Sequence, residues 1–140
     1  MKVFLDTNVL LDILMESRPR HYDSVTILKM AEKGAIDAYM SSQSIIDASY
    51  VFSQNGKMPV SVFKNALRRI LSIVRIVPIT GDNIKAAIHS QNEDFEDAAQ
   101  LDCSLDIGSD AIVSADKKMA EFSFPVYPPT VFCDFMFDRE

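Results

Sequence analysis

Short apolar runs alternate with longer segments of helical pattern along this chain, and that alternation most constrains how it can fold. The first run, Val3-Phe4-Leu5, is apolar at every position, which is typical of a parallel strand buried on both faces. Similar runs predict strands at residues 3–5, 35–40, 73–78, 109–114 and 125–127. Strands that alternate with helices pair in parallel through crossover connections. The pattern therefore predicts an α/β fold of three layers, with a central parallel sheet of about five strands between helices.

Helices are expected in the intervals between these strands. They are predicted at residues 9–15, 22–33, 43–55, 59–72, 80–90, 92–108 and 130–136, with a helical turn at 117–121. Thr7 and Asn8 offer capping side chains to the first helix, Pro59 suits a helix start, and Gly34 and Gly56 suit helix ends.

Length and composition are those of a globular protein with one domain, spanning residues 1–140. The sequence shows neither a signal peptide pattern nor an apolar stretch of membrane-spanning length. Cys103 and Cys133 fit no metal-binding spacing, so we expect reduced thiols in a cytoplasmic protein. The net charge of −6 argues against broad nonspecific nucleic-acid binding, but it is compatible with a nuclease whose carboxylates hold divalent cations.

Carboxylates follow two of the predicted strands. Asp6 comes directly after the first strand, and Asp116 comes after the fourth, with Ser114 two residues before it. Open α/β sheets bind their ligands beyond the carboxyl ends of the strands, so both acids are candidate site residues. Each also has a purely structural explanation, because Asp6 suits a helix cap and Asp116 suits a turn before a helical segment.

Two further acids begin a predicted helix. Asp94 and Asp97 are three residues apart and share a helix face, which continues through apolar positions toward Leu105. A core-facing stripe thus becomes acidic at the helix start. The alternative is that Asp94 is the N-cap and Asp97 its capping-box partner. Glu93 and Glu96 are expected to be solvated.

Asp47 is the only charged residue between Asp37 and Lys57, and it lies in a segment that is apolar nearly all round. Such a helix is expected to be buried, where a lone carboxylate is costly unless it is paired or bound to a metal. The alternative is that Asp47 points outward through a narrow polar strip with Ser44 and Gln54.

If these acids converge at one edge of the sheet, they cannot all stay ionised without a cation. Ligand sets made only of oxygen select hard cations such as Mg²⁺ or Mn²⁺. Such ions activate water and stabilise a phosphoryl transition state, so the acids Asp6, Asp47, Asp97 and Asp116 indicate phosphodiester hydrolysis.

Four segments together resemble the PIN-domain ribonucleases, a family that includes the VapC toxins of bacterial toxin–antitoxin pairs. They are Asp6-Thr7-Asn8 after a strand, the run SSQSIIDASYV at 41–51, the block DFEDA at 94–98, and the run IVSAD at 112–116. The resemblance covers nearly the whole chain, and the DFEDA block is its most specific part. It implies a three-layer α/β/α PIN-like fold and a Mg²⁺- or Mn²⁺-dependent endoribonuclease.

The resemblance also implies roles for individual residues. The matching acidic positions are catalytic, and three of them, Asp6, Asp97 and Asp116, are implied metal ligands. Asp47 matches a position that is often Glu in the family, so its shorter side chain favours contact through water. Asn8 and Ser114 match positions that orient the acids, and Asp94 is an extra acid seen in part of the family.

Partners follow from the same resemblance. RNA is the implied substrate, with Lys117 and Lys118 as the best placed basic residues and Arg18 and Arg20 as weaker candidates; all four also suit ordinary solvated positions. An antitoxin protein is a second expected partner. A homodimer is expected because the segment 131–137 carries more apolar surface than one helix face can bury. His21 and His89 are expected at the surface, which leaves no obvious general base.

Three alternatives remain open on the sequence. A catalytically inactive PIN-like module that only binds a partner is favoured by the aspartate at position 47. A haloacid-dehalogenase-like phosphatase needs a second acid two residues after the first, where this chain has Asn8. A phosphoacceptor receiver domain needs adjacent acids near the N-terminus and a lysine just after its last core strand, and neither is clear here.

Overall fold

The computed structural model describes residues 1–55, 58–116, 118–119 and 123–138, and its centre is one parallel sheet. The strands lie in the order β3-β2-β1-β4-β5. Their bounds are β1 (Lys2–Leu5), β2 (Asp37–Ser41), β3 (Arg75–Val77), β4 (Ala111–Val113) and β5 (Val126–Tyr127). In the middle of the sheet, Phe4 is paired with Tyr39 on one side and with Ile112 on the other. The predicted five-stranded parallel sheet is confirmed.

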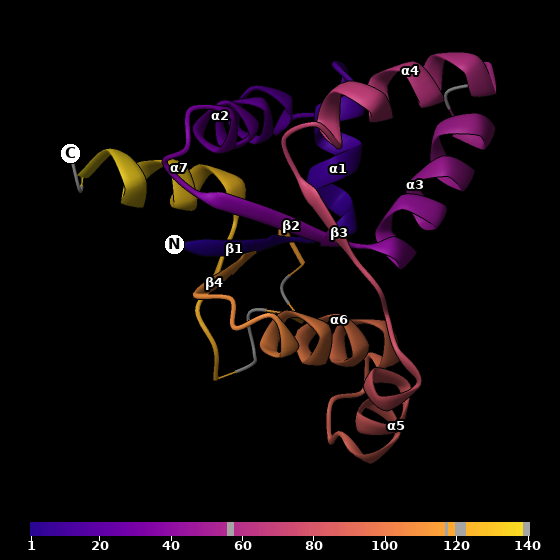
Figure 1. The fold of residues 1–140 in the computed structure, drawn as a ribbon, viewed down its shortest axis with the longest axis vertical. Coiled ribbons are helices and arrows are strands. Elements are labelled where there is room, and N and C mark those ends of the chain that lie inside the picture. The colour runs from indigo at the N-terminus through magenta and orange to yellow at the C-terminus, as the bar shows by residue number, and fades with distance from the viewer. Residues whose placement is uncertain (56–57, 117, 120–122, 139–140) are drawn as a thin grey trace.

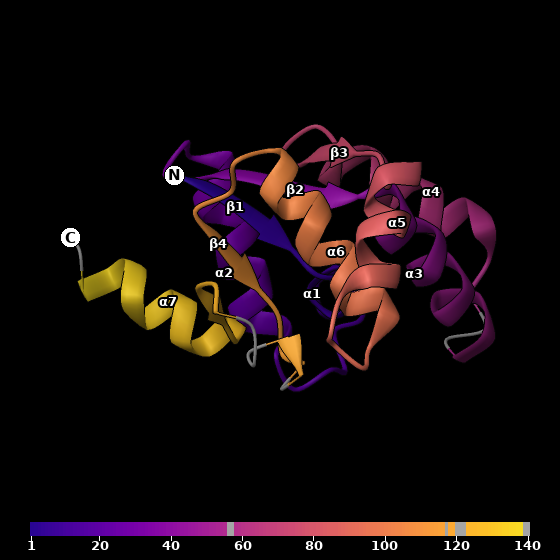
Figure 2. The same cartoon turned by 90° about the horizontal axis from the view of Figure 1, so that it is seen from below.

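Helices cover both faces of this sheet (Figure 1). They are α1 (Thr7–Leu14), α2 (His21–Glu32), α3 (Ser42–Asn55), α4 (Val60–Ile70), α5 (Gly81–His89), α6 (Phe95–Asp106) and α7 (Pro129–Asp138). The helices α1 to α4 lie on one side, where α7 packs against α2, and α5 and α6 lie side by side on the other (Figures 1 and 2). The three-layer prediction is therefore confirmed.

Alternate residues of the central strands supply the two halves of the core, as the two-residue period of a strand requires. Val3 and Leu5 of β1 belong to the cluster under α1 to α4, while Phe4 between them packs with Cys103 of α6. All three of these β1 side chains are fully buried. This two-sided burial explains why the strand is an uninterrupted apolar run.

The chain order of the strands creates a switch point between β1 and β4. From β1 the chain builds outward through β2 to β3, and it then returns to add β4 and β5 on the opposite side of β1. Ligand sites of open α/β sheets lie at such points, beyond the carboxyl ends of the strands. The backbone N–H of Asp6 donates to the carbonyl of Val113 at 3.0 Å, which joins the two strand ends there.

Two expectations about the helices are wrong. The first helix begins at Thr7 and is capped by Asp6, because the Asp6 side chain already accepts the first free N–H. Helix α3 is not buried all round, since Ile46 and Tyr50 are 64% and 68% exposed. On α7, Phe132 is buried in the face that docks on α2, while Val131 and Phe137 stay exposed, so the segment does carry apolar surface beyond its packed face, as predicted.

Two predictions, a helix end at Gly56 and a helical turn at 117–121, involve positions that are not described. Gly56 and most of the turn at 117–121 lie outside the described residues. Gly34 does follow α2 with a φ of 81°, the left-handed conformation that glycine adopts most easily. Among the described helices, none is both long and apolar enough to cross a membrane.

Candidate active site

Three carboxylates meet at the switch point. One oxygen from each of Asp94, Asp97 and Asp116 lies within 4.8 Å of the other two. Asp94 also caps α6, since its Oδ1 accepts from the N–H of Asp97 at 3.0 Å. Asp116 Oδ1 accepts from the N–H of Lys118 at 2.9 Å. The capping and turn explanations are thus correct for these two acids, but they coexist with a shared acidic cluster.

Asp97 is the buried member of this cluster, with 5% exposure. Its Oδ2 has no hydrogen-bond partner among the described residues. Burial, followed by the hydrogen bond and charge of Asp116, raises the pKa of Asp97 to about 8. It does not complete a capping box, because the N–H of Asp94 donates to Asn92 Oδ1 instead. A buried carboxylate with a free oxygen beside two more acids is arranged to bind a cation.

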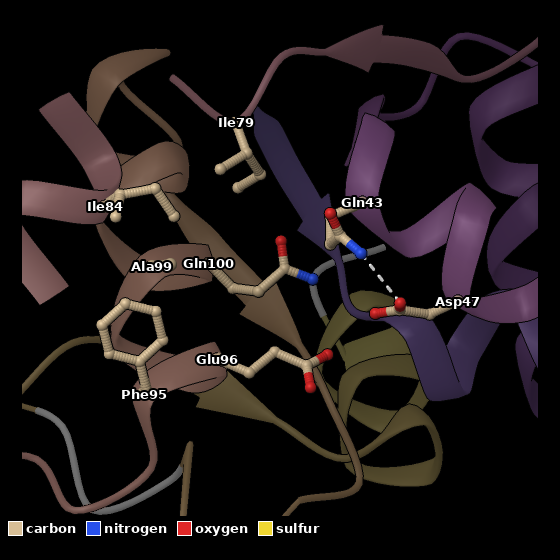
Figure 3. A pocket seen from close by; sticks show the side chains of 8 residues that line it. All are labelled: Gln43, Asp47, Ile79, Ile84, Phe95, Glu96, Ala99 and Gln100. Carbon is tan, nitrogen blue, oxygen red and sulfur yellow. Dashed lines mark hydrogen bonds between the residues drawn. The ribbon is translucent and has the colours of Figure 1, made fainter. Parts of the chain in front are cut away.

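A second acidic pair lies beside the cluster, formed by Asp47 of α3 and Glu96 of α6. Asp47 is half-buried, and its Oδ1 accepts from Gln43 Nε2 at 2.9 Å (Figure 3). Partial burial, followed by the charge and hydrogen bond of Asp47, raises the pKa of Glu96 to about 7. Asp47 therefore faces the acids of α6. Neither burial within an apolar helix nor an outward strip with Gln54 describes its position.

Glu96 was missed as a site residue. It keeps contact with solvent as expected, yet it also lies against Asp47. The charges of Asp6 and Asp94 raise its pKa in the same direction, so Glu96 also lies near these two acids. Its place inside the DFEDA block was the available signal.

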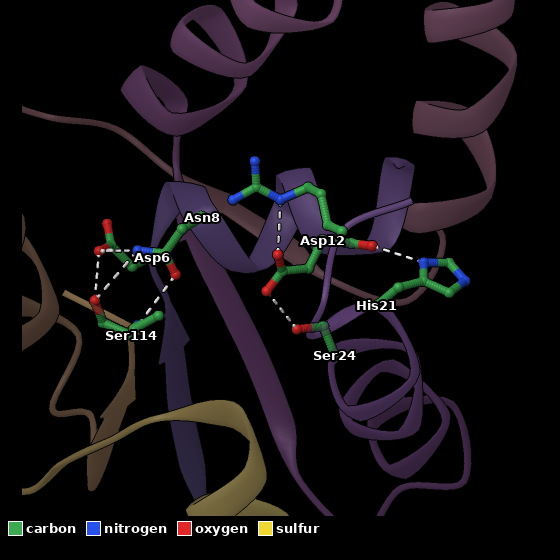
Figure 4. Close-up of polar contacts among 8 residues, drawn as sticks. Asp6, Asn8, Asp12, His21, Ser24 and Ser114 are labelled. Carbon is green, nitrogen blue, oxygen red and sulfur yellow. Dashed lines mark hydrogen bonds and ion pairs between the residues drawn. The ribbon is translucent and has the colours of Figure 1, made fainter. Parts of the chain in front are cut away.

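Asp6 is held by four hydrogen bonds, and Figure 4 shows those that it accepts from Asn8 and Ser114. Its Oδ1 accepts from the N–H of Thr7 at 2.8 Å and from Gln100 Nε2 at 3.4 Å. Its Oδ2 accepts from Ser114 Oγ at 2.7 Å and from Asn8 Nδ2 at 3.2 Å. Burial raises the pKa of Asp6, opposed by the bonds from Ser114 and Thr7. The three acids that meet within 4.8 Å do not include it, so metal contact by Asp6 stays a prediction.

Asn8 and Ser114 tie the ends of β1 and β4 together. Asn8 Nδ2 donates to Ser114 Oγ at 3.4 Å as well as to Asp6, and Asn8 Oδ1 accepts from the N–H of Ala115 at 3.2 Å. Ser114 Oγ also accepts from the N–H of Asp116 at 3.0 Å. The two side chains lie where residues that orient Asp6 and Asp116 are needed.

Gln100 is a second residue that the sequence did not single out. It is 1% exposed, and its Nε2 donates to Ser44 Oγ at 2.8 Å. Ser44 Oγ also accepts from Thr7 Oγ1 at 2.8 Å, so a buried polar network joins α6, α3 and α1. The only sequence signal was a glutamine between Ala99 and Leu101 on an otherwise apolar stretch.

The predicted RNA-binding residues that the structure describes lie in different environments. Lys118 is exposed and lines a shallow pocket with Asp94, while Lys117 lies outside the described residues. Arg20 is exposed. Arg18 instead pairs with the buried Asp12, with 2.8 Å between Nε and Oδ1, which gives it a structural role (Figure 4).

Neither histidine lies in the acidic site. His89 is exposed, as expected. His21 is half-buried, because its Nδ1 is hydrogen-bonded to the carbonyl of Asp12 at 2.7 Å. That carbonyl belongs to the same residue that pairs with Arg18 and accepts from Ser24 Oγ at 3.0 Å. This second polar cluster holds α1 to the start of α2.

A comparison with protein families identifies the type of domain to which these acids belong. The model of the PIN domain matches residues 2–118, which include every acid of the cluster. The chain belongs to the PIN domain family. A curated relative, ribonuclease VapC1 of Aquifex aeolicus, is 28% identical over 138 residues, spanning 95% of this chain and 94% of that protein.

Solved structures agree with the PIN assignment at the level of the fold. VapC20 of Mycobacterium tuberculosis, a toxin that cleaves the sarcin–ricin loop, has a TM-score of 0.70 at 16% identity, over 87% of this chain and 95% of that chain. A toxin–antitoxin complex from Klebsiella pneumoniae has a TM-score of 0.66 at 17% identity, over 91% of this chain and 97% of that chain. PIN membership replaces the phosphatase and receiver alternatives.

Proposed function

We propose that this PIN domain is a Mg²⁺- or Mn²⁺-dependent endoribonuclease that hydrolyses RNA phosphodiester bonds. The observation that carries the proposal is the buried Asp97, which lies in a cluster with Asp94 and Asp116 at the switch point of the sheet and has one oxygen without a hydrogen-bond partner among the described residues. Ribonuclease VapC1 of Aquifex aeolicus, which matches along nearly the whole chain, supports the same reaction class.

The residues present fit a divalent metal ion. The cluster offers only carboxylate oxygens, which are the ligands that Mg²⁺ and Mn²⁺ prefer. Asp97 and Asp116 would hold the ion, together with Asp94, with Asp6, or with both. When bound, such an ion supplies positive charge that activates water and stabilises the phosphoryl transition state.

The other residues prepare the site for this reaction. Asn8 and Ser114 hold the Asp6 carboxylate through hydrogen bonds of 3.2 and 2.7 Å, so it needs no reorganisation when substrate binds. Burial, followed by the hydrogen bond and charge of Asp116, raises the pKa of Asp97 to about 8, so its carboxyl group favours a proton near neutral pH and would lose it if it held a cation. Lys118 lies exposed beside Asp94, where its charge suits an RNA phosphate.

A role as the toxin of a toxin–antitoxin pair is part of the proposal. It is supported by the name of the curated relative and by the Klebsiella pneumoniae complex. The genomic neighbourhood tests it: a small upstream open reading frame with a DNA-binding pattern is expected. Coexpression of that reading frame should yield a stable complex that no longer cleaves RNA.

A homodimer is also proposed, because Val131 and Phe137 remain 48% and 55% exposed on α7. Exposed apolar patches of this kind commonly mark interfaces. Light scattering at tens of micromolar protein is expected to give twice the chain mass. A monomeric mass would refute this part of the proposal.

The decisive experiment is cleavage of a long structured RNA with Mg²⁺, with Mn²⁺ and with EDTA. Cleavage is expected only with metal, and Asp97→Asn should abolish it. Asp134→Asn makes the same change at an exposed position of α7 and should cleave normally. If the unmodified protein shows no metal-dependent cleavage, the enzyme is refuted and the inactive partner-binding module is favoured.

A further inference from the structure

A pocket opens beside the acidic cluster between α3, α6 and the segment that leads into α5 (Figure 3). Its volume is about 240 Å³. Pockets for drug-sized ligands measure roughly 300–1,000 Å³, so this one suits a smaller group such as a single heterocyclic base. The three acids of the cluster, Asp94, Asp97 and Asp116, do not line this pocket, so its occupant requires another explanation.

One side of the pocket is apolar. Phe95 and Ile84 are 49% and 38% exposed, and they line it together with Ile79. An aromatic ring that is half open to solvent in a nuclease is a stacking platform for an unpaired base. Phe95 lies between Asp94 and Glu96 in the sequence, so a base stacked on it sits next to the acidic cluster.

The other side contains a buried acceptor without a partner. The carboxamide of Gln100 points its Nε2 toward α1 and α3, where it donates to Ser44 Oγ at 2.8 Å and to Asp6 Oδ1 at 3.4 Å. Its Oε1 is then left in the pocket wall, unpaired within the described part of the chain. Leaving a buried acceptor unpaired is unfavourable, so a ligand that brings a donor gains from it.

The remaining polar groups of the pocket add further acceptor oxygens. Asp47 and Glu96 contribute carboxyl groups, and the nearby amide donor of Gln43 is already engaged with Asp47 at 2.9 Å. Such a wall selects a base whose edge carries donors. Guanine presents N1–H and an amino group side by side, whereas uracil presents one N–H between two carbonyl oxygens. Paired donors match a carboxylate best.

We propose that this pocket holds a guanine base of the RNA beside the bond that is cut, so that the enzyme prefers certain cleavage sites. The assignment rests on the proposed ribonuclease function. Phe95 stacks on the base, and the acceptors of Asp47, Glu96 and Gln100 receive its donors. The ring lies in the first turn of α6 with Asp97, and Asp94 caps the same helix, so a bound base brings its own phosphate near the cluster.

Binding is tested without cleavage. NMR spectra of the intact protein in EDTA are recorded with guanosine, inosine and uridine, which carry no phosphate and so avoid repulsion by the acids. Guanosine is expected to shift the signals of Ala99 and Gln100. Inosine lacks the amino group and should bind roughly tenfold more weakly, and uridine should bind more weakly still. Equal shifts with all three nucleosides, or none, would overturn the guanine assignment.

Variants separate stacking from folding. Phe95→Ala should lose guanosine binding, and Phe95→Tyr, which keeps a ring, should restore it. Tyr22→Ala removes a 75% exposed ring from α2, on the opposite side of the sheet, and serves as the matched control. If Phe95→Ala binds guanosine as the control does, the pocket is not the binding site and the proposal is wrong.

Sequencing of cleaved RNA ends distinguishes the failure of this proposal from that of the nuclease. We expect cuts enriched next to guanine, with the enrichment lost in Phe95→Ala. Metal-dependent cleavage without base preference would keep the nuclease and refute the pocket. Guanosine binding without any cleavage would keep the pocket and refute the nuclease. If an arginine-containing peptide but no nucleoside shifts these signals, the pocket is a protein-docking site instead.

Discussion

Replacing Asp97 by asparagine should make the metal-free protein more stable, but it should make the metal-loaded protein less stable. Asp97 is 5% exposed, and its pKa rises from 3.8 to about 8 on folding, first through burial and then through Asp116. A carboxyl group with a raised pKa binds its proton more tightly in the folded state. Its contribution to stability is therefore complete below pH 4 and is lost as the pH rises toward 8. Asparagine does not titrate, so the variant does not lose stability in this way.

The size of the effect follows from proton linkage. One extra proton in the folded state makes the unfolding free energy fall by about 1.4 kcal/mol per pH unit within that window. Asp6 and Glu96, whose pKa values are also raised, add to the slope in both proteins, so the difference between the proteins isolates Asp97. In EDTA, Asp97→Asn should become progressively more stable than the unmodified protein between pH 5 and pH 8.

Urea denaturation at several pH values measures this difference, with Asp134→Asn as the control for loss of an exposed charge. Near pH 5, where the unmodified protein has lost only about 1.4 kcal/mol relative to the variant, metal should reverse the order, because an ion at one hundred times its Kd stabilises the unmodified protein by about 2.7 kcal/mol and leaves the variant unaffected. Parallel pH profiles for the unmodified protein and Asp97→Asn would show that Asp97 does not carry the extra proton. An equal response of both proteins to Mn²⁺ would place the metal elsewhere.

Three further predictions concern neighbouring residues. Asp47→Asn should cut RNA cleavage severely, with partial rescue by Mn²⁺, and Asp47→Glu should retain activity; two neutral results in the cleavage assay would remove Asp47 from the site. Ser114→Ala should lower the unfolding free energy by about 1–3 kcal/mol, measured in urea, because it takes a hydrogen bond from the buried Asp6. Arg18→Ala should cost a similar amount by leaving Asp12 unpaired, and an unchanged KM for RNA would exclude Arg18 from substrate binding.

The sequence by itself determined the layers of the fold and the kind of chemistry. Buried parallel strands need continuous apolar runs, so residues such as Val3, Phe4 and Leu5 identified β1 without any knowledge of their partners. Acids placed just after strands, such as Asp6 and Asp116, pointed to the carboxyl edge of the sheet for the same local reason. These features depend on neighbours within a few positions, which a single sequence displays.

Only the tertiary structure decided which acids meet. Asp94 completes the cluster with Asp97 and Asp116. Asp6 is not part of this cluster and instead accepts a hydrogen bond from Ser114, 108 residues away in the chain. The exposed face of α3, the contact of Asp47 with Glu96 and the unpaired oxygen of Gln100 were equally hidden. The apolar pattern of a segment shows that a side chain faces inward. Which groups it then contacts depends on the strand order and on the crossover paths between distant segments. The local sequence does not encode how close such distant segments lie.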